Sequence, residues 1–236
     1  MNIKQKYNYD IVLCHEDKNY KKMFGNSKLI LFEKFPSQCF YYLGLKRLYD
    51  IIFVADATQP TKNHCLMNDF LKYCEDKEFE IKVAYVSNKY ILSKNYKNFI
   101  SEDKLKHVKL RYFTDLTPDD LNLLYNKSKI NLILSGRDCC PRVISESLIC
   151  GCFNIALSTL SDGKFYYRDI LGKILFFDNL LVKNINRSLC YVKHFRIFFN
   201  ILYFVLEGNF DHERISKLYQ SIFSEEIFYK KLIDLL

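Results

Sequence analysis

Apolar runs of strand length alternate along this chain with segments of helical period, and this alternation constrains the fold more than any other feature. The run D-I-I-F-V-A at 50–55 is continuous, as expected for a strand that is buried on both faces of a sheet. After a turn, Leu66, Phe70 and Cys74 recur at every fourth position, which places them on one face of a helix over 63–74. The predicted strands are 9–14, 28–32, 50–55, 81–87, 108–113, 130–135, 153–157 and 173–177.

Two further helices carry their own boundary signals. Thr117 is a suitable N-cap, Pro118 fits the first helical position, and the two aspartates that follow favour the positive end of a helix. A second helix is expected to begin at Pro141 and to end at Gly151. From about residue 183 onward the sequence favours helix.

The regular exchange of strand and helix predicts βαβ units. The expected fold is α/β, with a Rossmann-like, mostly parallel sheet and helices on both faces. We expect a short N-terminal segment over 1–48, the Rossmann-like domain over 49–182, and a C-terminal helical segment over 183–236.

Composition places the chain among ordinary globular proteins, because 49% of its 236 residues are hydrophobic and 26% are charged. The formal charge of +8 favours an anionic partner such as a nucleotide, a nucleic acid or an acidic membrane surface. The nine cysteines show neither a C-x-x-C pair nor a Cys/His spacing of zinc type. Reduced thiols in a cytosol and no metal site are therefore expected.

No apolar run of signal-peptide type is present at the N-terminus. The most lipophilic segment, 197–206, is about half as long as a membrane-spanning helix. A buried helix is the favoured interpretation of this segment, and a membrane-facing patch is the alternative. We expect a cytoplasmic protein that is soluble or peripheral to the inner face of a membrane.

Ligands of parallel α/β sheets bind beyond the carboxyl ends of the strands, which here points to the turns at 56–63 and 135–141. Lys62 lies in the first turn, where a cation beside a helix N-terminus suits a phosphate. An ordinary solvated lysine is the alternative. His64 is expected to be a surface or capping residue rather than a catalytic one.

The second turn carries Asp138 just before a helix and Glu146 within it. Either Asp138 or a phosphate of a ligand caps the first N–H groups of this helix. Glu146 lies too far along the helix for dipole stabilisation. It either forms an i, i+4 surface pair with Arg142 or accepts hydrogen bonds from the vicinal hydroxyls of a ribose.

From residue 50 to about 178, the order of these motifs resembles the nucleotide-sugar-binding half of GT-B glycosyltransferases, most closely the group-1 retaining class. The most specific element is acid-x7-acid, here Asp138 and Glu146, followed by a glycine turn and a strand. The resemblance implies that Glu146 holds the ribose hydroxyls, that Asp138 contacts the donor sugar, and that Lys62 binds the diphosphate. It also implies a base-binding loop at 112–114. The implied donor-binding set is Lys62, Asn63, Phe113, Thr114, Arg137, Asp138, Arg142 and Glu146, of which Lys62, Asp138 and Glu146 are the catalytic candidates.

Three features depart from that family. Asp138 stands where a glutamate is usual, and Ala55-Asp56 stands where Gly-Arg commonly precedes the lysine; Arg137 or Arg142 would have to supply the missing charge. Only residues 1 to about 48 precede the matching region, whereas such enzymes have a whole acceptor domain there.

The expected function is retaining transfer of a sugar from a nucleoside diphosphate to a glycan or lipid-linked acceptor, with no cofactor and no metal. The first alternative is a non-catalytic or split donor-binding module that needs a partner chain for the acceptor site. The second alternative is a basic Rossmann-like nucleic-acid-binding protein. It is disfavoured because no aromatic-basic stacking motif or basic cluster of the expected kind was identified.

Overall fold

The structure, a computed structural model, describes about two thirds of the chain. The described residues are 11–14, 28–31, 38–93, 96, 99–136, 138, 142–157, 160, 174–177, 201–203, 206–221, 226, 229–230 and 233–234.

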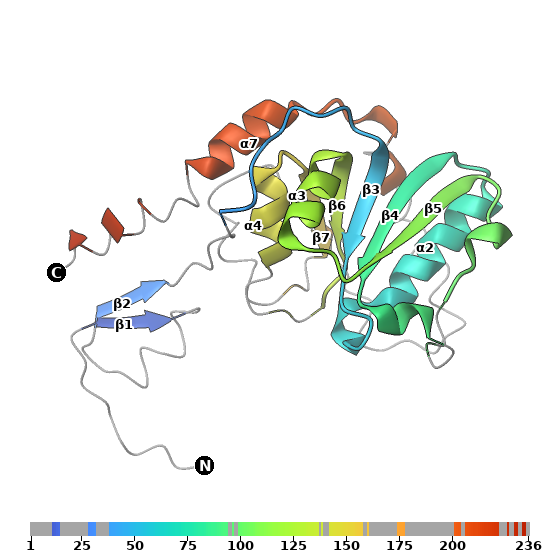
Figure 1. Ribbon diagram of the computed structural model, residues 1–236, viewed down its shortest axis with the longest axis horizontal. Helices are drawn as coiled ribbons and strands as arrows, with labels where there is room; N and C mark the ends of the chain where they lie inside the picture. The colour runs from blue at the N-terminus through green and yellow to red at the C-terminus, as the bar shows by residue number, and fades with distance from the viewer. Residues whose placement is uncertain are drawn as a thin grey trace, which may run out of the picture.

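Strands and helices follow one another in the order that the sequence predicts (Figure 1). The strands are β1 (Ile11–Cys14), β2 (Lys28–Leu31), β3 (Tyr49–Val54), β4 (Ile81–Ser87), β5 (Val108–Thr114), β6 (Ser128–Ile133), β7 (Phe153–Leu157) and β8 (Ile174–Phe177). The helices are α2 (His64–Asp76), α3 (Pro118–Asn126), α4 (Arg142–Ile149) and α7 (His212–Gln220), with 3-10 turns η1 (Pro60–Lys62), η2 (Lys89–Leu92) and η3 (Glu102–Lys104). The predicted N-cap is confirmed, because the Thr117 hydroxyl accepts a hydrogen bond from the backbone N–H of Asp120.

Six strands form one sheet in the order β5-β4-β3-β6-β7-β8, and every pair of neighbours is parallel. The prediction of a Rossmann-like parallel sheet is thus confirmed. β1 and β2 form a separate two-stranded parallel sheet. β6 begins two residues earlier than predicted because Ser128 already pairs with Tyr49 of β3.

The chain reverses its direction across the sheet at β3. It first runs from β3 through β4 to the edge strand β5, and then returns past β3 to β6, β7 and β8. Since crossovers between parallel strands are right-handed, the helices of the two halves lie on opposite faces. Figure 1 shows α2 beside β4 and β5, and α3 and α4 beside β6 and β7.

Burial follows the position of each strand in the sheet. Ile51, Ile52 and Phe53 of β3 are at most 1% exposed, which confirms the prediction of a strand covered on both faces. β5 instead alternates buried and exposed residues in its first half, as expected for an edge strand. The predicted apolar face of α2 is also confirmed, since its members Leu66, Phe70 and Cys74 are all buried.

The connection that precedes β3 is fastened to the domain by Arg47. Its guanidinium donates hydrogen bonds to the carbonyls of Tyr125, Ser128 and Cys150 at 2.8, 2.8 and 3.0 Å. These carbonyls belong to the ends of α3 and α4 and to the start of β6. One side chain therefore joins three elements at the amino edge of the sheet.

Much of the lipophilic 197–206 segment lies outside the described residues. Within the described part, Ile201 and Leu202 are buried, whereas Tyr203 and Leu206 are more than half exposed. None of the helices in the described ranges has the length and apolar character needed to cross a bilayer.

Candidate nucleotide-sugar site

The two loops that the sequence singles out meet at the reversal point of the sheet. β3 and β6 are hydrogen-bonded neighbours, and their carboxyl ends lead into the loops 55–63 and 134–141. The helices that follow, α2 and α4, lie on opposite faces of the sheet. This reversal point is the position at which doubly wound sheets bind their ligands.

The loop after β3 is shaped by Asp56. Its carboxylate accepts hydrogen bonds from the backbone and the hydroxyl of Thr58 at 2.9 and 2.7 Å, from Gln59 at 3.1 Å and from Asn88 at 2.6 Å. Partial burial raises the pKa of this carboxyl, but the four hydrogen bonds outweigh that effect and leave the pKa below its ordinary value. Asp56 is therefore a structural anion that holds the loop and ties it to the residue after β4.

Backbone and side-chain bonds join the two loops directly. The Asn63 amide donates a 2.6 Å hydrogen bond to the carbonyl of Leu134, and the N–H of Gly136 donates to the carbonyl of Thr61 at 3.1 Å. Asn63 adopts the left-handed conformation (φ 54°), which asparagine tolerates better than most residues. Its side chain does not cap α2. The first backbone N–H groups of α2 therefore receive no hydrogen-bond acceptor from Asn63.

Lys62 and Asp138 form an ion pair between the two loops, although they lie 76 positions apart in the chain. Each side chain is only 17% exposed. The alternative of an ordinary solvated lysine is therefore wrong for Lys62. Whether Asp138 also caps α4 depends on residues 139–141, which lie outside the described residues.

Glu146 projects from the second turn of α4 and is buried, with 8% of its surface exposed. Burial raises the pKa of its carboxyl to about 7, and the nearby charge of Arg142 lowers it only partly. Arg142 is exposed, and no ion pair joins these two residues. Among the described residues no side chain donates a hydrogen bond to the Glu146 carboxylate. The i, i+4 surface pair is therefore not formed, and the carboxylate is left as a buried acceptor.

Phe113 and Thr114 lie at the carboxyl end of β5, on the same edge of the sheet but three strand positions from β6. At about 4.8 Å per strand this is roughly 14 Å, and neither residue contacts the Lys62–Asp138 pair. Ser87 connects the strands between them, because its hydroxyl accepts from Ala57 N–H at 2.9 Å and its carbonyl accepts from Asp115 N–H at 3.2 Å. Arg137 lies outside the described residues.

His64 differs from expectation, because it is 5% exposed rather than a surface residue. Its Nε2 lies 3.0 Å from the carbonyl of Asp56 and its Nδ1 lies 2.7 Å from the hydroxyl of Tyr85. Since a carbonyl only accepts, Nε2 carries the proton and Nδ1 accepts from Tyr85. Burial lowers the pKa of His64, which keeps it neutral. The sequence places His64 directly after Lys62 and Asn63, but the aromatic surroundings that bury it come from β3, β4 and residue 96.

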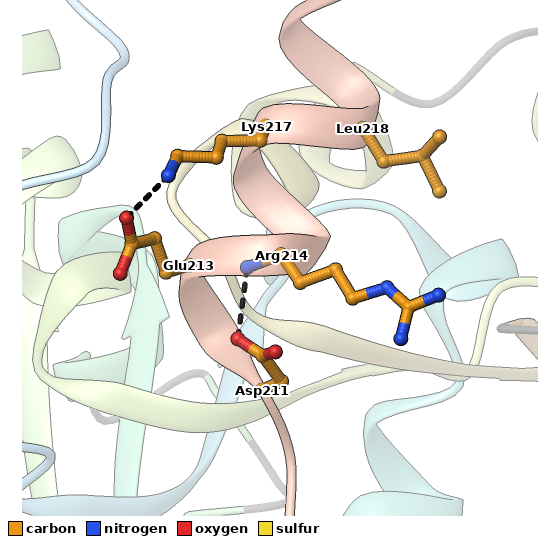
Figure 2. A pocket seen from close by; sticks show the side chains of 5 residues that line it. All are labelled: Asp211, Glu213, Arg214, Lys217 and Leu218. Carbon is orange, nitrogen blue, oxygen red and sulfur yellow. Dashed lines mark hydrogen bonds and ion pairs between the residues drawn. The ribbon is translucent and has the colours of Figure 1, made fainter.

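A pocket lies away from these loops, at the start of α7 (Figure 2). α7 packs against α4, and the imidazole Nδ1 of His212 lies 2.8 Å from the carbonyl of Gly151, at the amino edge of the sheet. Figure 2 shows that Lys217 pairs with Glu213 and that Asp211 caps the backbone N–H of Arg214, whereas no dashed line reaches the Arg214 guanidinium. Within the described ranges, no cluster of three or more His, Cys, Asp or Glu side chains is arranged to hold a metal.

Comparisons with known proteins agree with this architecture. Neither a protein-family model nor a curated protein sequence matches the chain. Among solved structures, the chain is similar to the pneumococcal O-GlcNAc transferase GtfA in complex with UDP and GlcNAc, with a TM-score of 0.63 and 11% identity. TarM superposes with a TM-score of 0.59 and 15% identity, and sucrose-phosphate synthase from Thermosynechococcus elongatus with 0.57 and 13%.

These superpositions cover 95–97% of this chain, and the chain accordingly has the fold of the GT-B glycosyltransferases. It spans only part of each neighbour: 44% of GtfA, 42% of TarM and 60% of the synthase.

Proposed function

We propose that the chain binds a nucleoside diphosphate sugar at the β3 and β6 loops and that it is the donor-binding half of a retaining glycosyltransferase. The observation that carries this proposal is the Lys62–Asp138 ion pair, which brings a cation and an acid from distant loops to the reversal point of a parallel sheet. The buried carboxyl of Glu146, to which no described side chain donates a hydrogen bond, lies on the helix that follows the second loop.

Each residue has a role that its chemistry allows. The Lys62 ammonium carries three N–H donors, so it can keep Asp138 and still donate to a diphosphate oxygen. The N-terminus of α2 adds backbone N–H groups, and both stabilise the negative charge that develops on the leaving diphosphate. Glu146 accepts the two ribose hydroxyls, Asp138 contacts the sugar, and the base lies toward Phe113 and Thr114. Arg142 lies four positions before Glu146 on α4, and we assign to it the further positive charge that the diphosphate requires.

The test is a thermal-shift titration of the full chain with UDP, GDP and ADP. A nucleotide at 100 times its Kd should stabilise the protein by about 2.7 kcal/mol. Lys62→Ala and Glu146→Ala should remove the shift. Lys129→Ala is the matched control, because Lys129 pairs with Asp50 at 2.7 Å and so joins the same two strands at the opposite, amino edge. No shift with any of the three nucleotides would refute the donor site.

A second candidate is a donor-binding module whose acceptor site belongs to another polypeptide. The chain matches 44% of GtfA and 42% of TarM, and both neighbours contain further residues outside the match. A nucleotide-dependent shift without hydrolysis or transfer of the sugar by the isolated chain would support this candidate over the complete enzyme.

A further inference from the structure

The positive charge of the chain is concentrated in the β4–β5 connection and the first half of β5. Residues 88–111 contain seven Lys or Arg against two acids, so about a tenth of the sequence carries five of the eight net positive charges. Lys94 and Lys97 of this segment lie outside the described residues. No basic cluster is expected above, and this segment corrects that expectation.

This connection links β4 to the edge strand β5 in an unusual way. The other described crossovers of the sheet between β3 and β7 contain an α-helix, whereas this one contains the short 3-10 turns η2 and η3. The segment is nevertheless fastened to the edge strand, because Glu102 accepts from the N–H of Tyr112 at 3.1 Å and the Tyr112 hydroxyl donates to the Ile100 carbonyl at 3.1 Å. A long connection without a helix of its own is usually functional.

Large apolar side chains of the same connection face solvent. Tyr90, Leu92 and Phe99 are 40%, 55% and 45% exposed. Two of them are held by other rings: Phe99 stacks on Tyr112 at 5.2 Å, and Tyr90 meets Tyr96 edge-on at 5.9 Å. These ring contacts hold the side chains of Tyr90 and Phe99 in exposed positions. Exposed apolar side chains that lie together are typical of an interaction surface.

The cations of the connection and of β5 also face solvent, although Lys109 donates a 2.7 Å hydrogen bond to the Lys106 carbonyl and Arg111 lies over the Phe113 ring. Lys104, Lys106, Lys109 and Arg111 are exposed, and none of them forms an ion pair with another described residue. The neighbouring carboxylate of Glu75 is occupied, because it accepts from the backbone N–H groups of residues 106–108. Among the described cations of this segment, Lys89 is paired, with Asp115 at 3.3 Å, and remains 81% exposed.

We propose that Lys89–Leu92, Phe99, Lys104, Lys106, Lys109 and Arg111, the β4–β5 surface, dock on an anionic lipid bilayer. Lysines are attracted to a negatively charged bilayer, and aromatic and aliphatic side chains enter its headgroup boundary. A nucleic acid fits less well, because aliphatic Leu92 cannot stack on a base and one face of the Phe99 ring is already covered by Tyr112. Six of the seven cations are lysines, which act as point charges rather than bidentate donors.

Docking would bring the candidate donor site close to the bilayer. η2 follows β4 directly, so Tyr90 and Leu92 lie at the same carboxyl edge of the sheet as Lys62. A lipid-linked acceptor would then be delivered from the surface on which the protein rests. This consequence rests on the proposed function, whereas the docking itself does not.

The experiment is vesicle flotation of the full chain. Vesicles of pure phosphatidylcholine are compared with vesicles that also contain roughly 30 mol% phosphatidylglycerol, which gives the surface a strong negative charge. We expect binding only to the anionic vesicles and a decline with added salt. Lys104→Glu/Lys106→Glu should weaken binding roughly tenfold or more. Leu92→Ser should weaken it severalfold without removing the salt dependence.

The matched control reverses two exposed cations at the other end of the molecule, Lys46→Glu/Arg214→Glu, which should retain vesicle binding. Melting temperature and nucleotide shift, measured on the same variants, separate loss of docking from loss of fold or of the donor site. Equal loss in the control, or no binding to anionic vesicles at low salt, would overturn the proposal. Salt-dependent binding to a single-stranded RNA with no vesicle binding would assign the surface to nucleic acid instead.

Discussion

Burial makes the carboxyl of Glu146 costly to ionise in the folded protein. Its pKa is about 7 in the fold, compared with 4.5 for an unperturbed glutamate. A raised folded pKa means that the folded state binds the proton more tightly than the unfolded state. Stability is therefore lost as pH rises from about 4.5 through about 7, by on the order of 3 kcal/mol in total.

The first prediction concerns Glu146→Gln. Since the amide cannot ionise, the variant should escape this loss, and its free energy of unfolding relative to wild type should improve by about 2 kcal/mol or more between pH 5 and pH 8. Urea unfolding at the two pH values measures this difference. Glu75→Gln is a useful comparison, since hydrogen bonds from the backbone N–H groups of residues 106–108 outweigh desolvation and lower the Glu75 pKa below 4.5. Its pH effect has the opposite sign and falls at lower pH, so this variant should show little change between pH 5 and pH 8. Parallel pH curves for Glu146→Gln and wild type would contradict the assignment.

The second prediction concerns the pH dependence of nucleotide binding. Ribose hydroxyls donate to the ionised carboxylate, so binding favours the deprotonated form of Glu146. Nucleotide affinity should therefore fall as pH is lowered below about 7, by up to about tenfold per pH unit. Calorimetric titration from pH 5.5 to 8 provides the measurement. A pH-independent Kd would show that Glu146 does not hold the ribose.

Among the helices and strands, some boundaries are local and others depend on packing. The start of α3 follows from Thr117 and Pro118 alone, and the structure agrees with the sequence there. The end of α4 at Gly151 was predicted from the glycine, but the structure supplies a second reason for it. A Cβ at this position would lie 2.5 Å from the carbonyl oxygen of His212 and 2.9 Å from the Arg47 guanidinium. Gly151 is thus also the point where α7 approaches the domain.

The third prediction is that Gly151→Ala destabilises the protein by at least about 2 kcal/mol. The backbone has φ 82°, which disfavours a side chain, and the added methyl meets backbone of α7 that cannot easily yield. Chemical unfolding measures the effect. Gly136→Ala is the matched control, because its Cβ would lie 3.6 Å from the Asn63 amide, an ordinary contact. Equal stabilities of the two variants would show that α7 does not pack as described.

For the whole molecule, the decisive feature is the adjacency of β3 and β6. Through it the bonds Asn63–Leu134 and Thr61–Gly136 join loops from the two halves of the sheet, and the Lys62–Asp138 pair follows. A ligand bound at these two loops, as proposed above, would contact both halves at once. The opposite edge, where Lys129 pairs with Asp50 and α7 begins, is not part of the same site.

The fourth prediction follows from this geometry. A saturating nucleotide should slow amide hydrogen exchange in both 56–64 and 142–149, because one ligand orders both segments. Amides of His212–Gln220, at the amino edge, should change little beyond the global stabilisation. Exchange followed by mass spectrometry with and without UDP makes this comparison. Protection confined to one of the two loops would place the ligand elsewhere.

The sequence by itself determined the α/β class, all the described strands to within about two residues, the cap of α3 and the two loops that carry Lys62 and Asp138. These depend on hydrophobic periodicity and on residues that are neighbours in the chain. Only the tertiary structure decided which strands are neighbours, that Lys62 and Asp138 form an ion pair, that His64 is buried and that Glu146 lacks a partner among the described residues. The reason is physical: strand order, burial and the resulting pKa values depend on atoms that approach from distant parts of the chain, and periodicity carries no information about them.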